Sequence, residues 1–191
     1  IVFSHANSFP AGCYRLLFED WRAAGYTVHA LDKFGHDPKY PVTLHWPRLR
    51  DQLIAFTELH TQGPVFFVGH SLGGFLSLLA AAKRPDLAHA VLLLDSPLIG
   101  GMLGQTIQVA MLTGIGRRFS PGNVSQRRRQ HWPTMEAVHK HFASKAAFAK
   151  FDPQVLQDYV DCGFEPAQAP HPRGYTLAFT REIETDIYNT L

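Results

Sequence analysis

Cysteine is scarce in this sequence, which contains only Cys13 and Cys162 among its 191 residues. Two cysteines allow at most one disulfide, and they do not form the C-x-x-C spacing typical of zinc sites and of thiol–disulfide exchange. We therefore predict no zinc site. Two reduced thiols in a cytoplasmic protein are favoured over a single structural disulfide.

A charge excess and a long hydrophobic run are also absent. The 18 Lys and Arg residues against 16 Asp and Glu residues give a formal charge of +2, which is too balanced for the concentrated basic field that nucleic acids and acidic membranes attract. The apolar stretches are too short and interrupted to span a bilayer, and no basic segment with a signal core begins the chain. We predict a soluble, cytoplasmic protein with no nucleic-acid partner and no membrane span.

An initiator methionine is missing as well. The chain begins at Ile1 inside a pattern typical of a buried strand and stops at Leu191 inside a helical pattern, so we expect a fragment of a longer protein. With 46% hydrophobic and 18% charged residues, the chain is still able to bury a sizeable core as one domain, with room for a subdomain.

Strand-like and helical patterns alternate along the first half of the chain. Strand patterns lie at 1–4, 26–31, 65–68 and 90–94, and helical patterns lie at 14–25, 46–60 and 72–82. Three of the strands are continuous apolar runs, as expected for strands that are buried on both faces. Because right-handed crossovers place helices on both faces of such a sheet, we predict an α/β fold with a mostly parallel sheet.

The alternation is lost after Asp95, where glycine and proline become frequent. Helical patterns recur at 105–113, 134–150 and 153–161, and one strand is predicted at 175–179. This change of pattern indicates a mainly helical insertion. The predicted units are a sheet domain at 1–96, the helical insertion at 97–175 and a returning helix at 176–191.

A serine lies where a predicted strand changes into a predicted helix. Residues Gly69 to Gly73, with Ser71 at the centre, match G-x-S-x-G in the strand–turn–helix context that a nucleophilic serine requires. The turn leaves no space for Cβ atoms at the glycines and forces the serine into strained φ and ψ angles. Its hydroxyl is then held at a helix N-terminus, where partial positive charge favours an oxyanion. The alternative is that Ser71 only caps the helix.

Together with this motif, the segment FSHAN at residues 3–7 resembles the oxyanion loop of the α/β-hydrolase superfamily. In that family one oxyanion N–H comes from this loop and the other from the residue after the nucleophile. The resemblance therefore implies that the backbone amides of Asn7 and Leu72 are the donors, with Ala6 where glycine is usual. It also implies an incomplete sheet, because the first and last strands of the family have no counterpart here, and a lid at 97–175.

Two histidines next to these donors, His5 and His70, are candidates for contact with the substrate. For His5, the main alternative is that its ring holds the loop through hydrogen bonds to its neighbours. His139 and His141 are two apart on a helical pattern and therefore do not form a metal-binding pair.

A serine nucleophile needs a histidine base that is oriented by a carboxylate. The family order is Ser, then Asp or Glu, then His, and the histidines after Ser71 are His89, His131, His139, His141 and His171. His89 precedes its strand, at the wrong edge of the sheet, and the others lie in the predicted lid. Asp95 is the candidate acid because it ends the neighbouring strand, with a turn-capping aspartate as the alternative. We expect the base to lie beyond residue 191.

Two features of the predicted lid have open interpretations. The basic residues Arg117, Arg118 and 127–131 either attract an anionic substrate or form a solvated basic face. The apolar residues between Met102 and Leu112 either line an acyl pocket or pack the lid onto the core. Neither feature identifies a substrate.

The sequence as a whole predicts a serine hydrolase that acts on an ester, thioester or related acyl bond of a small molecule through Ser71. No metal or organic cofactor is implied. Because the base is missing, we expect this chain to be weakly active or inactive. The alternative is a non-catalytic, ligand-binding relative of the hydrolases, and no oligomeric state is predicted.

Overall fold

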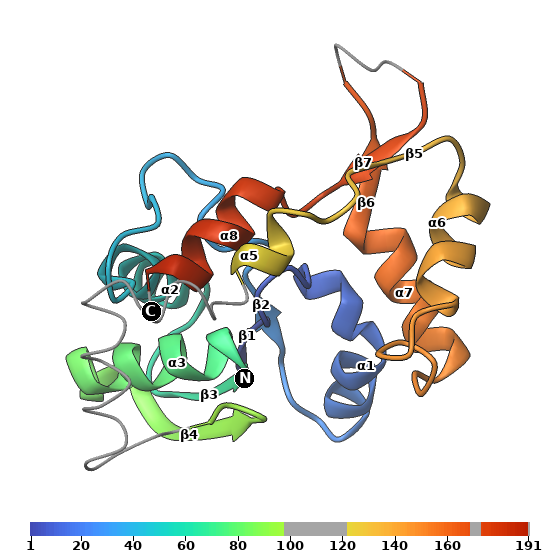
Figure 1. The fold of residues 1–191 in the computed structure, drawn as a ribbon. Helices are drawn as coiled ribbons and strands as arrows, with labels where there is room; N and C mark the ends of the chain where they lie inside the picture. Colours follow the sequence, from blue (N-terminus) through green and yellow to red (C-terminus); the bar gives the residue numbers. More distant parts are fainter. Residues whose placement is uncertain (98–121, 169–172, 191) are drawn as a thin grey trace.

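The computed structural model describes residues 1–97, 122–168 and 173–190, and its main element is a parallel sheet (Figure 1). The four strands are β1 (Val2–Ser4), β2 (His29–Ala30), β3 (Val65–His70) and β4 (Ala88–Leu94), in the order β2-β1-β3-β4. All three pairings are parallel, with Val2 opposite Phe67 and Ser4 opposite Gly69. The predicted α/β fold with a mostly parallel sheet is therefore confirmed.

Helices cover both faces of this sheet. They are α1 (Arg15–Ala23), α2 (Pro47–His60) and α3 (Leu72–Lys83), with short 3₁₀ helices η1 (Ala11–Tyr14) and η2 (Pro85–Leu87). Successive strand residues point to opposite faces, so Phe67 packs with Leu53 of α2 and Leu76 of α3, whereas Val68 packs with Phe18 of α1. Burial on two faces therefore accounts for the apolar residues at 67 and 68, whereas Phe66 in the same run is 40% exposed.

A second group of elements follows the parallel sheet in sequence. It comprises α5 (Gly122–Ser125), β5 (His131–Trp132), α6 (Met135–Ala143), α7 (Pro153–Gly163), β6 (Phe164–Pro166) and β7 (Tyr175–Leu177). The strands form an antiparallel sheet in the order β5-β7-β6. We call this group of elements, from α5 to β7, the cap region. Trp132, Phe142 and Tyr159 are buried in its apolar cluster.

The prediction that no strand precedes residue 175 in this part of the chain is wrong. β5 has two residues and β6 has three, too few for an alternating pattern to be visible in the sequence. The helical pattern at 105–113 and the residues Met102 to Leu112, Arg117 and Arg118 lie outside the described residues, so the domain boundaries at 96 and 175 stay predictions.

The last helix, α8 (Arg181–Asn189), returns to the first core. Ile187 is buried in the same cluster as Trp46 and Leu49, and the Trp46 indole Nε1–H donates to the carbonyl oxygen of Ile187 at 3.1 Å. Figure 1 shows α8 lying beside α5, with the parallel sheet on one side and α6 and α7 on the other. α8, which follows the cap region, therefore packs into the same apolar cluster as Leu72, the residue after Ser71.

Candidate active site

Ser71 occupies a sharp turn between β3 and α3. Its φ and ψ angles are 50° and −114°, in a sparsely populated region that costs a residue with a Cβ roughly 1–3 kcal/mol. The side chain makes no capping hydrogen bond to α3, so the alternative that Ser71 only caps this helix is wrong. The strain predicted for this serine is present.

The three glycines of the turn each face a different neighbour. A Cβ at Gly69 would overlap the backbone of Gly73 and Gly74, as expected for a tight strand–helix turn. A Cβ at Gly73 would instead overlap the carbonyl group of Ser4, and one at Gly74 would overlap the hydroxyl of Ser96. Only the first of these contacts lies within the turn; the other two bring in the loop after β1 and the end of β4.

Both backbone polar groups of Ser71 are held by the end of β4. The Ser71 N–H donates to the carbonyl oxygen of Leu94 at 3.0 Å, and the Ser96 hydroxyl donates to the Ser71 carbonyl oxygen at 2.9 Å. These bonds over-determine a strained backbone, which is the condition under which such a conformation persists.

The two predicted oxyanion donors come from segments that touch. Asn7 is 5% exposed and Leu72 is 3% exposed, and the contact of Gly73 with Ser4 brings the loop after β1 against the first turn of α3. Within the described parts of the chain, the backbone N–H groups of Asn7 and Leu72 donate no hydrogen bond. Two buried, unpaired amides on adjoining segments can stabilise a negatively charged oxygen.

The loop that carries Asn7 is connected by hydrogen bonds to α8 and, through α8, to the cap region. The Asn7 side-chain amide donates to the carbonyl oxygen of Glu184 on α8 at 3.0 Å. The Glu184 carboxylate in turn accepts from Arg128 of the cap region at 2.5 Å, and Arg128 also donates to the Tyr159 hydroxyl at 3.1 Å. Burial raises the pKa of Glu184, and the charge of Arg128 opposes that rise.

His5 lies beneath this loop with no exposed surface. Its Nε2 accepts a hydrogen bond from the Phe34 N–H at 3.0 Å, so its Nδ1 carries the proton that is donated to the Ala6 carbonyl oxygen at 2.7 Å. Burial lowers the pKa of His5 to about 4, which keeps the ring neutral. This arrangement matches the alternative in which His5 holds the loop, and it leaves neither ring nitrogen available to a substrate.

His70, the other predicted substrate contact, is half-buried at the end of β3, immediately before Ser71. Its Nδ1 lies 2.8 Å from the hydroxyl of Tyr14, and the same hydroxyl accepts the Ala6 N–H at 3.1 Å. Burial lowers the pKa of His70, and the charge of Asp95 opposes that shift. Nothing in the sequence pattern pointed to Tyr14, because it lies in a helical segment among other apolar residues.

Asp95 follows β4 with a left-handed φ of 46°. It lies next to the serine turn, because the preceding residue, Leu94, accepts the Ser71 N–H. No histidine of the described residues is hydrogen-bonded to its carboxylate. Nor does any described histidine bond to the Ser71 hydroxyl: His89 lies at the opposite end of β4, and His131, His139 and His141 lie in the cap region. His171 lies outside the described residues.

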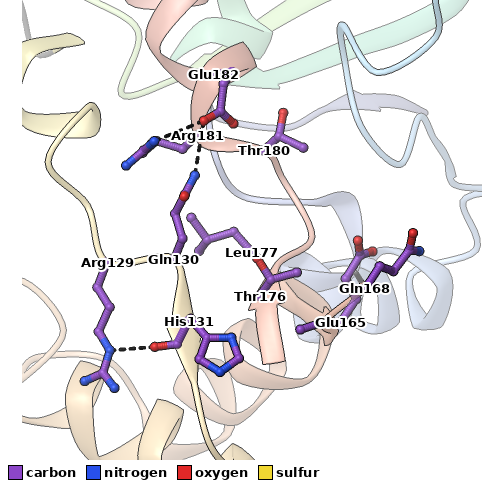
Figure 2. Close-up of a pocket in the computed structure, with 11 residues that line it drawn as sticks. Arg129, Gln130, His131, Glu165, Gln168, Thr176, Leu177, Thr180, Arg181 and Glu182 are labelled. Atoms are coloured by element: carbon purple, nitrogen blue, oxygen red, sulfur yellow. Dashed lines mark hydrogen bonds and ion pairs between the residues drawn. The ribbon is translucent and has the colours of Figure 1, made fainter. Parts of the chain in front are cut away.

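A cavity of about 590 Å³ lies between the cap sheet and the start of α8 (Figure 2). Its walls carry two arginines, Arg129 and Arg181, and two glutamates, Glu165 and Glu182, so their charges balance. Figure 2 shows Arg181 and Gln130 both reaching the carboxylate of Glu182. Ser71 does not line this cavity. The strained turn, and not this cavity, marks the candidate active site.

The basic run at 127–131 is not a uniformly solvated face. Arg128 is only 17% exposed and is paired with Glu184, and the guanidinium of Arg129 lies 5.3 Å from the centre of the Trp132 ring while its Nε donates to the His131 carbonyl oxygen. These two arginines bind other parts of the cap region and α8.

Among the residues that the structure describes, no three His, Cys, Asp or Glu side chains are close enough together to hold a metal ion. Over the same ranges, no helix has the length and apolar character needed to cross a bilayer. Cys13 is buried, Cys162 is exposed, and both are free thiols.

The sequence of this chain is similar to those of known hydrolases. A family model described as "Alpha/beta hydrolase family" matches residues 1–185. The chain is 30% identical over 179 residues to a monoglyceride lipase homolog of monkeypox virus, covering 86% of this chain and 59% of that protein. It is 25% identical over 129 residues to a monoacylglycerol lipase of Mycolicibacterium smegmatis, covering 64% of this chain and 46% of that protein.

Solved structures share the arrangement of elements. An E-2-(acetamidomethylene)succinate hydrolase superposes with a TM-score of 0.72 at 19% identity, covering 100% of this chain and 64% of that one. A thioesterase domain from the curacin biosynthetic pathway gives a TM-score of 0.67 at 17% identity, covering 96% of this chain and 64% of that one. The chain therefore spans less than two thirds of each of these four proteins.

Proposed function

Because the chain belongs to the alpha/beta hydrolase family, we propose that it carries the nucleophile and oxyanion donors of a serine hydrolase that acts on an ester, thioester or related acyl bond. The observation that carries this proposal is the conformation of Ser71, whose φ of 50° is held by crowded glycines and by the hydrogen bonds of its N–H and carbonyl groups with Leu94 and Ser96. A serine kept in a strained turn without a capping bond is accounted for by a role of its hydroxyl in chemistry.

In the proposed reaction, the Ser71 Oγ attacks the acyl carbonyl carbon while a histidine base removes the hydroxyl proton. The carbonyl π electrons move onto oxygen, and the N–H groups of Asn7 and Leu72 stabilise the resulting oxyanion. Each such donor contributes about 3 kcal/mol to the transition state. Collapse of the tetrahedral intermediate expels the alcohol or thiol, which takes the proton from the histidine, and water then releases the acid from Ser71.

The general base is not assigned to a residue, since no described histidine bonds to Ser71. Asp95 stays the proposed acid because it follows β4, the strand next to β3 in the sheet. The acyl class of substrate is supported by the serine nucleophile and by the names of the relatives, which include lipases and a thioesterase domain.

A fluorophosphonate probe tests the proposal, because it phosphonylates a serine only where a base and an oxyanion site activate it. The protein from the complete reading frame is expected to be labelled at Ser71, as located by mass spectrometry, and the Ser71→Ala variant is not. Ser77→Ala is the matched control, because Ser77 lies on the same helix but is fully buried. A natively folded protein that is not labelled would favour the non-catalytic, ligand-binding alternative.

A further inference from the structure

The hydroxyl of Tyr14 lies between the two segments that carry the proposed oxyanion donors. Its oxygen is 3.1 Å from the Ala6 backbone nitrogen and 2.8 Å from Nδ1 of His70. Ala6 immediately precedes Asn7, and His70 immediately precedes Ser71. One side chain from η1 therefore touches both halves of the site without belonging to either.

The direction of these hydrogen bonds follows from their chemistry. A backbone N–H can only donate, so the Tyr14 oxygen accepts from Ala6. Among the described residues, the Nδ1 of His70 is the acceptor at hydrogen-bonding distance from this buried hydroxyl, so we assign the phenol proton to that bond. The Nδ1 of His70 is then the acceptor, and the ring proton sits on Nε2. Burial raises the pKa of Tyr14 and lowers that of His70, so both partners stay in these neutral forms near neutral pH.

Packing fixes the phenol ring independently of these bonds. The ring centre of Tyr14 lies 4.6 Å from that of Phe3 on β1, and it meets the His70 ring edge-on at 5.8 Å. Since the aromatic contacts already order the side chain, the two hydrogen bonds cost little further conformational entropy. The hydroxyl therefore has a fixed position, and it fixes the positions of the two groups to which it is hydrogen-bonded.

We propose that Tyr14 is a positioning residue that ties the Ala6–Asn7 loop to the His70–Ser71 turn and fixes His70 as the Nε2–H tautomer. The inference rests on the proposed function, because its purpose is to keep the two oxyanion amides in register. Such amides act only when they are held within a few tenths of an ångström of the developing charge. The amide of Asn7 lies in the loop after β1 and that of Leu72 at the start of α3, so a contact between the two segments is needed to hold the amides together.

The first test is Tyr14→Phe, which removes the hydroxyl and keeps the ring. In the protein from the complete reading frame, we expect kcat for p-nitrophenyl butyrate to fall by about tenfold while KM stays within about twofold. Tyr26→Phe is the control, since Tyr26 is 47% exposed and packs edge-on against Phe66, and it is expected to match the wild type. A Tyr14→Phe variant with the wild-type kcat overturns the proposal.

The second test does not depend on activity, and its first measurement needs no variant. Nitrogen NMR of the His70 ring in the wild-type protein is expected to show an unprotonated Nδ1 and a protonated Nε2, and Tyr14→Phe is expected to lose this single tautomer. A wild-type His70 that carries its proton on Nδ1 overturns the proposal. If the wild type hydrolyses no ester but Tyr14→Phe still changes the His70 tautomer, the proposed function fails and the positioning role of Tyr14 stands.

Discussion

Gly73, in the first turn of α3, lies directly against the carbonyl group of Ser4 at the end of β1. This contact is where the serine turn meets the loop that carries Asn7. The second glycine of the G-x-S-x-G motif is therefore required by a neighbour that is distant in sequence, in addition to the shape of the turn itself. The approach of the two segments depends on the absence of a single Cβ.

Gly73→Ala tests this approach. In an ordinary helix, alanine is more stable than glycine by about 1 kcal/mol, but here the new Cβ would displace the Ser4 carbonyl and with it the loop. We expect the free energy of unfolding in urea to fall by about 2 kcal/mol and kcat to fall by about 100-fold.

The control for Gly73→Ala is Gly63→Ala. Gly63 has a φ of +95° and no atom within 4 Å of an added Cβ, so this change costs only backbone strain of about 1–2 kcal/mol and leaves kcat unaltered. A Gly73→Ala variant that is more stable than the wild type and equally active would show that the loop does not lie against α3.

The buried ion pair between Arg128 and Glu184 links the cap region to α8. Their side chains are 17% and 6% exposed and are 2.5 Å apart. Arg128→Ala leaves the carboxylate buried without its partner, so we expect the free energy of unfolding to fall by about 3–5 kcal/mol. Lys83→Ala removes a pair with Asp51 whose lysine is 47% exposed and is expected to cost no more than about 1 kcal/mol. Equal losses in urea unfolding would contradict this prediction.

Stability should depend on pH through His5. Its pKa is about 4 in the folded protein, lowered from 6.5 by burial, which the hydrogen bond to Ala6 opposes and the charge of His36 reinforces. Between these two values the unfolded chain binds more protons, so stability falls as pH drops from about 6.5 towards about 4, by roughly 3 kcal/mol in all.

Urea unfolding of the wild type and of His5→Gln, at about pH 7 and about pH 4.5, isolates this contribution from that of the carboxylates. We expect the stability difference between the two proteins to shrink at the lower pH. A difference in stability that stays constant with pH would mean that the pKa of His5 is the same in the folded and unfolded protein.

The central strands β1 and β3 were predictable because both carry buried apolar residues on their two faces. Phe67 and Val68 point to opposite sides and are both covered, so the strand is visible as a continuous apolar run. The predicted strand at 26–31 shortens to the two residues of β2, which lies at the sheet edge. Tyr26, which precedes β2, is 47% exposed. Residues with a high β propensity form a strand only where a neighbouring strand can pair with them.

The turn at Ser71 was predictable because its glycines are close to the serine in the sequence, although two of the neighbours that require them, Ser4 and Ser96, are distant. The groups that hold the turn and the loop were not. Asn7 binds a carbonyl 177 residues away at Glu184, and Tyr14 reaches His70 across 56 residues. Such contacts depend on how the segments pack and leave no periodic pattern in the sequence.

The backbone amide of Asn7, rather than its side chain, is the proposed oxyanion donor, and two substitutions at this position separate the two groups. Asn7→Pro removes the N–H as well as the side-chain bond to Glu184, whereas Asn7→Ala removes only the side-chain bond. Loss of one oxyanion donor costs about 10²–10³ in kcat, so the proline variant should be slower than the alanine variant by about that factor in hydrolysis of p-nitrophenyl butyrate. Equal kcat values for two folded variants would assign the effect to the side chain and remove Asn7 from the oxyanion site.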